Sequence, residues 1–305
     1  MGRLKIITFI STFFIILSVY GQKKDYGKEW LSIEQLEIDG KVTSAFEKTE
    51  QLLKKVRNAK NDEQILKCLL FKWKFQQIID EKSQVKILEE VATEIEKQSF
   101  PNKQLLEMYL AHFLKTHLNN TFWQIQRRTA TENAALKDYR TWDVNTFINQ
   151  ISKHYENALQ PSVNLATVPT SNITALLIES PESRKYKPSI YDIIAYQAID
   201  FYTNSRNRVN KPKDEFLITS PDYFANSQTF IQQKITTTDQ ESLLFKALKV
   251  YQNLEKIHAQ QKSEEALIFN IKNRLEFVKK NHTGTNTNEL YLESLQNLNL
   301  SLIHI

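Results

Sequence analysis

The chain has 305 residues and a formal net charge of +5, with 41% hydrophobic and 11% aromatic residues. This apolar content argues against disorder, and only five Gly and seven Pro argue against a sheet protein with many tight turns. The basic runs, Lys54–Arg57 and Arg127–Arg128, are short and accompany no nucleic-acid motif. Composition therefore predicts a helical protein with an apolar core and no nucleic-acid partner.

The amino terminus has the three parts of a secretory signal peptide. Arg3 and Lys5 form a positive region, an apolar run follows, and Val19 and Gly21 suit the expected cleavage site. The run is shorter than the roughly 18–20 residues that span a bilayer. We expect residues 1–21 to contact the membrane only before cleavage, and the mature chain to lie in the periplasm or cell envelope. An uncleaved membrane anchor is the alternative.

Apolar residues recur at helical spacing through residues 22–160, which we predict to be a first helical-repeat block. Gly40 is expected to end the first helix, Asp62 to cap the third and Pro101 to precede a restarted helix. Asp143 is expected to cap the last helix of this block. The stripes of the five best-marked helices are Trp30, Ile33, Leu36; Val42, Ala45, Phe46, Leu52, Leu53, Val56; Ile65, Leu66, Leu69, Leu70, Trp73, Ile78; Leu105, Tyr109, His112, Phe113, Thr116; and Val144, Phe147, Ile148, Ile151, Tyr155, Leu159.

Four prolines between residues 161 and 188 predict a long loop with at most one short apolar element. Ser189 and Asp192 form an acidic version of a capping box, which marks the start of the next helix. Thr238 and Glu241 predict a second capping box ahead of another helix. The second helical block is expected over residues 189–299, with its last helices at 264–280 and 287–298.

Helices of about fifteen to twenty residues with very short connections suggest helical hairpins stacked as in a solenoid. Trp30, Gly40 and Ala45 loosely match the tetratricopeptide signature, but no clean repeat of about 34 residues recurs. The predicted fold class is therefore all-α: an irregular helical-hairpin repeat array, or TPR-like α-solenoid.

Catalytic motifs are absent from the sequence: it contains no HExxH, C-x-x-C, P-loop or GxSxG pattern. His112 and His117 are five residues apart, which places them on different helix faces and prevents a shared metal. Cys68 is expected to be a buried small hydrophobe. We predict no catalytic, cofactor-binding or metal-binding residue and no cofactor. An enzyme with a scattered site, dependent on His112 or His154, is the third-ranked alternative.

Aromatic residues concentrate on the predicted helix faces. We interpret them mainly as core between stacked helices. The alternative is that some line a concave groove for a peptide or a neighbouring domain. The residues are Trp73, Phe75, Phe122, Trp123, Trp142, Tyr191, Phe201 and Tyr202.

Four segments in order, "EWLSIEQLEIDGKVTSAFEKTEQLLKKVRNAKN", "QILKCLLFKWKFQ", "TWDVNTFINQISKHYENAL" and "YKPSIYDIIAYQAIDFY", resemble the amino-terminal part of large alpha-2-macroglobulin-like proteins of Bacteroidetes-type bacteria. The resemblance runs from about Tyr26 to Asn299. It implies an envelope-located, broad-range protease inhibitor in which this helical region precedes β-sandwich macroglobulin domains. The family thioester needs a Cys followed closely by Glu-Gln, which Cys68 lacks, so no inhibitory residue carries over.

Residues 300–305 read Leu-Ser-Leu-Ile-His-Ile, which the codons CTG-TCT-CTT-ATA-CAC-ATC encode. These bases resemble a transposase mosaic-end adapter used in sequencing libraries. We therefore expect residues 300–305 to be translated adapter and the natural chain to continue from about Asn299.

Our leading hypothesis is a non-catalytic amino-terminal module of a secreted alpha-2-macroglobulin-like protease inhibitor, not inhibitory alone. Its expected partners are the downstream macroglobulin domains, and possible further partners are proteases or envelope proteins. The runner-up is a freestanding helical-repeat adaptor of the envelope that binds a peptide or protein partner.

Overall fold

The computed structural model describes residues 25–128, 138–177, 182–209 and 212–303. These residues form α-helices and short 3-10 helices, with two isolated bridge pairs but no strand, which confirms the all-α prediction. The predicted signal peptide, residues 1–21, lies outside the described residues. Of the predicted adapter, residues 300–303 continue the last helix, and 304–305 lie outside the described residues.

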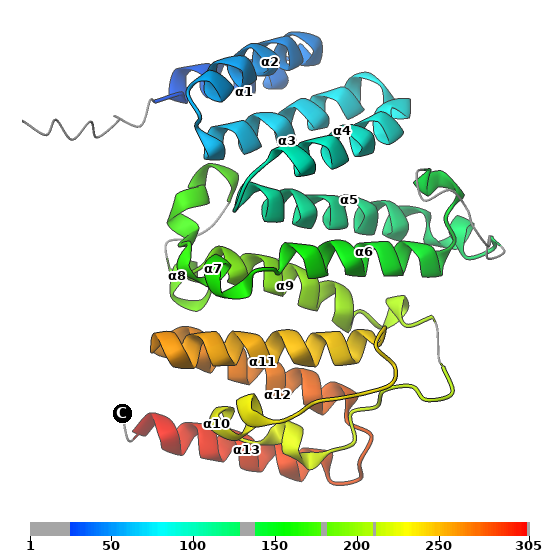
Figure 1. Cartoon of the computed structure of the whole chain (residues 1–305), viewed down its shortest axis with the longest axis vertical. Helices are drawn as coiled ribbons and strands as arrows, with labels where there is room; N and C mark the ends of the chain where they lie inside the picture. The colour runs from blue at the N-terminus through cyan, green and yellow to red at the C-terminus, as the bar shows by residue number, and fades with distance from the viewer. Residues whose placement is uncertain (1–24, 129–137, 178–181, 210–211, 304–305) are drawn as a thin grey trace, which may run out of the picture.

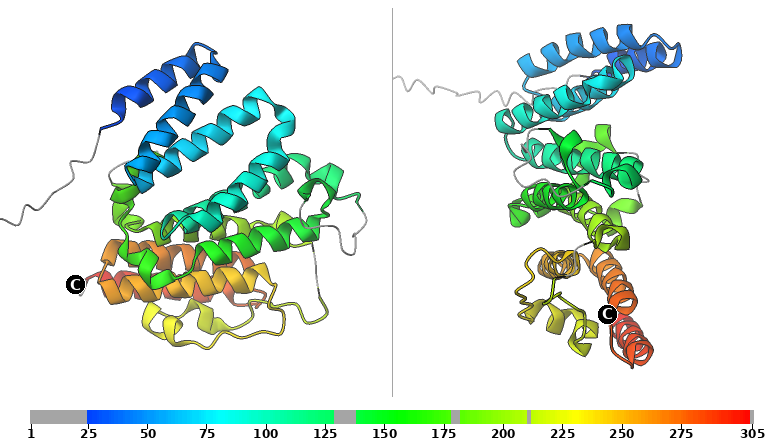
Figure 2. Two further views of the ribbon diagram at one scale, coloured as in Figure 1. Left: turned by 45° about the horizontal axis from the view of Figure 1, so that its top comes forward. Right: turned by 90° about the vertical axis from the view of Figure 1, so that its right-hand side faces the viewer.

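The longer helices stack in chain order along the longest dimension of the molecule, from α1 and α2 at one end to α13 at the other (Figure 1). Seen from the side, the array remains a narrow stack (Figure 2). The longer helices are α1 (Gly27–Ile38), α2 (Val42–Asn58), α3 (Asp62–Ile79), α4 (Gln84–Lys97), α5 (Asn102–Ile125), α6 (Val144–Ala158), α9 (Ile190–Thr203), α11 (Leu243–Gln261), α12 (Glu264–Asn281) and α13 (Thr287–Ile303). The shorter ones are η1 (Glu81–Ser83), η2 (Tyr139–Thr141), α7 (Ser162–Thr167), η3 (Thr170–Leu176), α8 (Ser183–Tyr186), η4 (Ser205–Asn207), η5 (Pro221–Phe224) and α10 (Ser227–Gln232).

Several predicted helix ends are confirmed by their hydrogen bonds. Gly40 lies between α1 and α2 with a φ of 73°, the left-handed conformation that glycine accepts without steric cost. Ser189 and Asp192 form the predicted capping box at the start of α9.

The predicted cap of α3 was wrong by one residue: Asn61 is the N-cap, and Asp62 is the first helical residue. Asp62 still stabilises the helix there, because negative charge is favourable in the first turn.

The predicted capping box of Thr238 and Glu241 is wrong. Thr238 donates its hydroxyl hydrogen to Asp214 instead, and α11 begins after Ser242, whose Oγ accepts a hydrogen bond from the helix. Asp143 caps α6 as predicted. Thr238 and Ser242, the two candidate N-caps of α11, lie only four residues apart, so the local sequence alone did not decide between them.

The apolar stripe predicted for α5 is only partly correct: Leu105 is buried and Tyr109 packs against the core, but His112 and Thr116 are exposed. α5 packs against α4 on one side and α6 on the other. A helix buried on two sides has no single apolar stripe, so the expected period fails. Its buried residues are Asn102, Leu105, Leu106, Glu107, Leu110, Ala111, Leu114, Leu118, Phe122 and Ile125.

The segment predicted as a loop, residues 161–188, contains the short helices α7, η3 and α8 between its described ends. It folds back on itself, since Thr170 N donates to Pro188 O at 2.9 Å. η3 packs on α3, where Ala175 N donates to Glu63 Oε1 at 3.0 Å. The prolines therefore interrupt the helices here without preventing short helical turns.

One hydrophobic core runs through both predicted blocks and includes nearly all of the aromatic residues expected there. Trp123 is the exception, with 74% of its surface exposed. Across the boundary, Tyr155 of α6 lies 5.8 Å from Phe201 of α9, measured between ring centroids. Among the described helices, none combines the length and apolarity that crossing a bilayer requires.

The packing of α6 predicts a large effect for Phe147→Ala. Phe147 is fully buried and its ring centroid lies 5.2 Å from that of Trp142 and 5.7 Å from that of His117. Its removal should lower the free energy of unfolding by about 3–5 kcal/mol. Trp123→Ala is the matched control and should change it by less than about 0.5 kcal/mol. Urea unfolding followed by far-UV circular dichroism measures both, and equal effects would contradict this account of the core.

Candidate functional site

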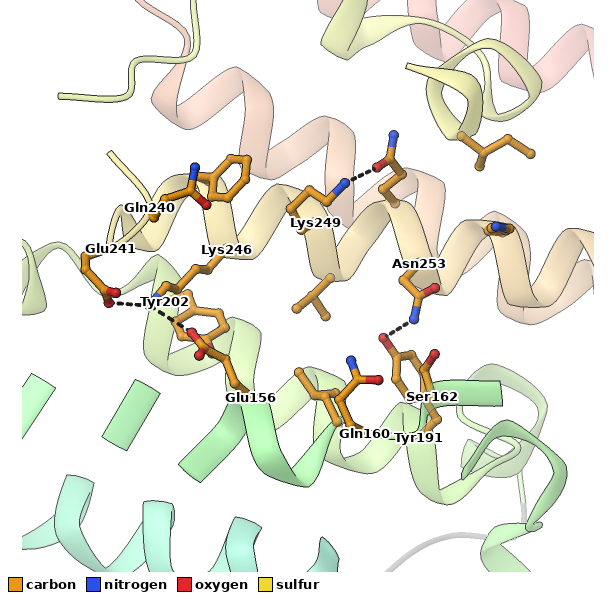
Figure 3. A pocket seen from close by; sticks show the side chains of 16 residues that line it. Glu156, Gln160, Ser162, Tyr191, Tyr202, Gln240, Glu241, Lys246, Lys249 and Asn253 are labelled. Carbon is orange, nitrogen blue, oxygen red and sulfur yellow. Dashed lines mark hydrogen bonds and ion pairs between the residues drawn. The ribbon is translucent and has the colours of Figure 1, made fainter. Parts of the chain in front are cut away.

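A polar depression of about 660 Å³ lies over the outer face of α11, and we call it the α11 trough (Figure 3). Its floor is α11. One wall comes from the end of α6, α7 and α9, and the other from α10 and the segment that leads into α11. The lining residues are Glu156, Leu159, Gln160, Ser162, Tyr191, Tyr202, Ile231, Gln240, Glu241, Phe245, Lys246, Lys249, Val250, Gln252, Asn253 and Lys256.

The floor of the trough is one polar row along α11. Lys246, Lys249, Asn253 and Lys256 follow one another at intervals of three, four and three residues. These intervals place successive side chains on the same face of a helix. The row therefore places three lysines and one amide along a single rigid element, and Lys249 and Lys256 are the exposed members.

One end of the trough is closed by an ion-pair cluster around Lys246 (Figure 3). Its ammonium nitrogen lies 2.8 Å from Glu156 Oε1 and 2.6 Å from Glu241 Oε2, and it donates to Ser152 Oγ at 3.1 Å. The Lys246 side chain is only 12% exposed. This cluster links α6, α11 and the segment before α11. One ammonium group faces two carboxylates, so the cluster keeps a net negative charge.

Amide side chains fix the middle of the trough. Asn253 Nδ2 donates to the hydroxyl of Tyr191 at 2.6 Å, which joins α11 to α9. Gln252 Nε2 donates to the carbonyl oxygens of Phe230 and Gln233 at 2.9 and 2.8 Å, which holds the end of α10 against α11. Both walls are therefore attached to the floor by side chains of the floor helix.

Lys249 and Lys256 are both exposed, and neither forms an ion pair with any residue that the structure describes. Lys249 Nζ donates only to the neutral Oε1 of Gln252, at 3.0 Å. Two positive charges therefore remain uncompensated on the floor. The arrangement suits a ligand that supplies negative charge and groups that pair with amides.

The opposite face of α11 contains a buried ion pair. Arg274 of α12 lies with its Nε 2.6 Å from Glu255 Oε1, and both side chains are inaccessible to solvent. Arg274 also donates to the carbonyl oxygens of Tyr223 and Ala225 at 2.5 and 2.9 Å. Burial raises the pKa of Glu255, and Arg274 opposes that shift. The pair holds α11, α12 and the η5 region together beneath the trough.

Ser189, Asp192 and His258 are in contact but do not form a catalytic triad. His258 Nε2 lies 2.7 Å from Asp192 Oδ1, and Ser189 Oγ donates to Asp192 Oδ2 at 2.6 Å. The serine hydroxyl therefore bonds to the carboxylate and not to the imidazole, which is the wrong order for activating a nucleophile. All three residues are buried. The group links α9 to α11.

The histidines considered from sequence do not converge. His154 Nδ1 lies 2.6 Å from Glu107 Oε2, between α6 and α5. His117 stacks on Phe147, whereas the charged neighbours of His112 are Lys115 and Asp200. Within the described ranges, no group of three or more His, Cys, Asp or Glu side chains is arranged to hold a metal ion.

Sequence reasoning did not identify the α11 trough. It predicted a helix after Glu241 but assigned no role to the lysines of that helix. Two of its aromatic candidates, Tyr191 and Tyr202, do line the trough, although both are buried. The helical spacing of Lys249, Asn253 and Lys256 was the one available signal in the sequence. It predicts only that these residues share a helix face, and it does not predict the two walls that turn this face into a trough.

Breaking the buried ion pair should be strongly destabilising. Arg274→Met should lower the free energy of unfolding by about 3–5 kcal/mol, because it leaves Glu255 buried without its partner. In the double variant with Glu255→Leu this charge is gone, so the total loss should fall short of the sum of the single losses by at least about 1 kcal/mol. Urea unfolding of the two single variants and the double variant measures the coupling. Additive losses would show that the two side chains act independently.

Cys68 should be unreactive in the folded protein. It is fully buried, as predicted, and burial raises the pKa of its thiol to about 12. Because the thiolate is the reactive form, a disulfide reagent at about pH 8 should label it only after unfolding. The reaction in high urea is the control, and rapid stoichiometric labelling without urea would contradict the buried position.

Comparison with protein families, with curated proteins and with solved structures finds no match to this chain.

Proposed function

We propose that the chain is a non-catalytic interaction module whose α11 trough holds a segment of another polypeptide or domain. The supporting observation is the row of exposed Lys249, half-buried Asn253 and exposed Lys256 on a floor fixed to both walls. A preformed surface of this kind binds without paying for its own ordering. Stacked helical hairpins also provide an extended surface of the sort that repeat proteins use for binding.

We further propose that this module is the amino-terminal helical region of an exported alpha-2-macroglobulin-like protein. The order of the sequence segments described above and the all-α fold support this assignment. Its partners would be the downstream macroglobulin domains of the same protein, or a protease or another envelope protein. A freestanding envelope adaptor is the second candidate, and it is favoured by a trough built entirely from this chain's own residues.

The genomic sequence around the codon for Asn299 separates these two candidates. For the macroglobulin-like protein we expect the native reading frame to depart from the sequence Leu-Ser-Leu-Ile-His-Ile and to continue into domains with strand-like alternation. A native stop codon directly after Ile305 would contradict that assignment and leave the freestanding adaptor.

A displayed library of random twelve-residue peptides tests binding at the trough. Peptides enriched on the purified chain should lose binding to the double variant Lys249→Glu/Lys256→Glu. The matched control is Lys54→Glu/Lys272→Glu, which makes the same change in charge at two exposed helical lysines outside the trough. Enriched peptides should bind this control as they bind the original chain. Failure to enrich any peptide sensitive to the trough variant would refute peptide binding there.

A further inference from the structure

We propose that the α11 trough selects an extended acidic peptide segment with two carboxylates three residues apart. One carboxylate contacts Lys249, the other contacts Lys256, and the peptide backbone between them passes over Asn253. This inference rests on the proposed function, because it names the class of polypeptide that the interaction module takes.

The charges of the trough determine the sign of the ligand. Of its three lysines, Lys246 is paired with both lining glutamates, Glu156 and Glu241. Lys249 and Lys256 retain unpaired ammonium groups within the described residues. The two glutamates would repel a carboxylate placed at the Lys246 end. The acidic segment therefore lies from Lys249 toward Lys256, away from that end.

The distance between the two lysines determines the spacing of the carboxylates. Lys249 and Lys256 are seven residues apart, which corresponds to about 10.5 Å along α11 at 1.5 Å per residue, on nearly the same face. An extended peptide advances about 3.3–3.6 Å per residue. A separation of three residues covers about 10–11 Å, whereas two residues cover about 7 Å and four about 13–14 Å. Three residues therefore match the lysines best.

The groups between the lysines favour a peptide over a nucleic acid. Asn253 donates through Nδ2 to Tyr191 and so directs its Oδ1 as an acceptor for a peptide N–H. Gln160 and Gln240 add amides on the two walls. Single-stranded nucleic acids bind largely by stacking bases on exposed aromatic rings. Tyr191 and Tyr202 are only 2% and 1% exposed. Phe245, the third aromatic residue of the lining, is half-buried and packs edge-on against Phe216, so the trough offers little ring surface for stacking.

Fluorescence anisotropy with synthetic eight-residue peptides tests the inference. The peptides carry two Asp residues two, three or four positions apart in a Gly/Ser background, and a matched peptide carries Asn at both positions. We expect the three-position peptide to bind tightest and the Asn peptide not to bind. Affinity should fall as ionic strength rises, because the contacts are between exposed charges.

Single variants assign the contacts. Lys249→Glu and Lys256→Glu should each weaken binding by about 2- to 30-fold, because each removes an exposed ion pair and adds a comparable repulsion. Lys54→Glu, an exposed lysine of α2 outside the trough, should leave binding unchanged. The unfolding curve of each variant shows whether it remains folded, so a lost contact is distinguished from a lost structure.

The outcomes separate this inference from the proposed function. If the peptides with all three Asp spacings bind equally, or if the Asn peptide binds, the proposed pair of carboxylates three residues apart is wrong. Tighter lysine-dependent binding of a single-stranded oligothymidylate than of any peptide overturns the choice of a peptide. If the displayed library yields trough-dependent peptides without paired acidic residues, the interaction module stands and this inference fails. If no peptide depends on the trough, both fail.

Discussion

The buried guanidinium of Arg274 holds four segments of the carboxyl-terminal half together. It pairs with Glu255 of α11, donates to the backbone carbonyls of Tyr223 and Ala225, and lies 4.2 Å from the ring centroid of Phe230 in α10. A planar group with several donors in a fixed arrangement can satisfy such a site, whereas a lysine cannot. Because burial of an unpaired charge is costly, each of these segments is held in one position relative to α12.

The α11 trough depends on this arrangement beneath its floor and on side-chain hydrogen bonds that attach its walls to α11. Gln252 attaches the end of α10 to α11, and the contact between Asp192 and His258 attaches α9 to the same helix. Buried polar pairs of this kind add little net stability compared with apolar residues of similar size. Their effect here is positional: apolar contacts are non-directional, whereas hydrogen bonds are directional, so a shifted register would leave these buried polar groups without partners.

Much of the fold could be predicted because apolar residues at helical spacing mark one buried face, as Phe147 does in α6. The prediction failed in α5, where two buried faces remove that period. The site could not be predicted. Lys249 and Lys256 have the sequence appearance of an ordinary solvated face, and Glu255 and Arg274 that of surface charges. Their different environments depend on segments distant in sequence, which local patterns do not specify.

Gln252 couples Lys249 on the floor of the α11 trough to the α10 wall. The same amide accepts a hydrogen bond from Lys249 and donates to the carbonyls that end α10. A ligand that draws the lysine away changes the hydrogen bonding of the amide that holds α10. Thermodynamic linkage then requires the reverse effect by the same factor: whatever alters the attachment of α10 alters the affinity at Lys249. The wall of the trough is thus also a point at which its affinity can be adjusted.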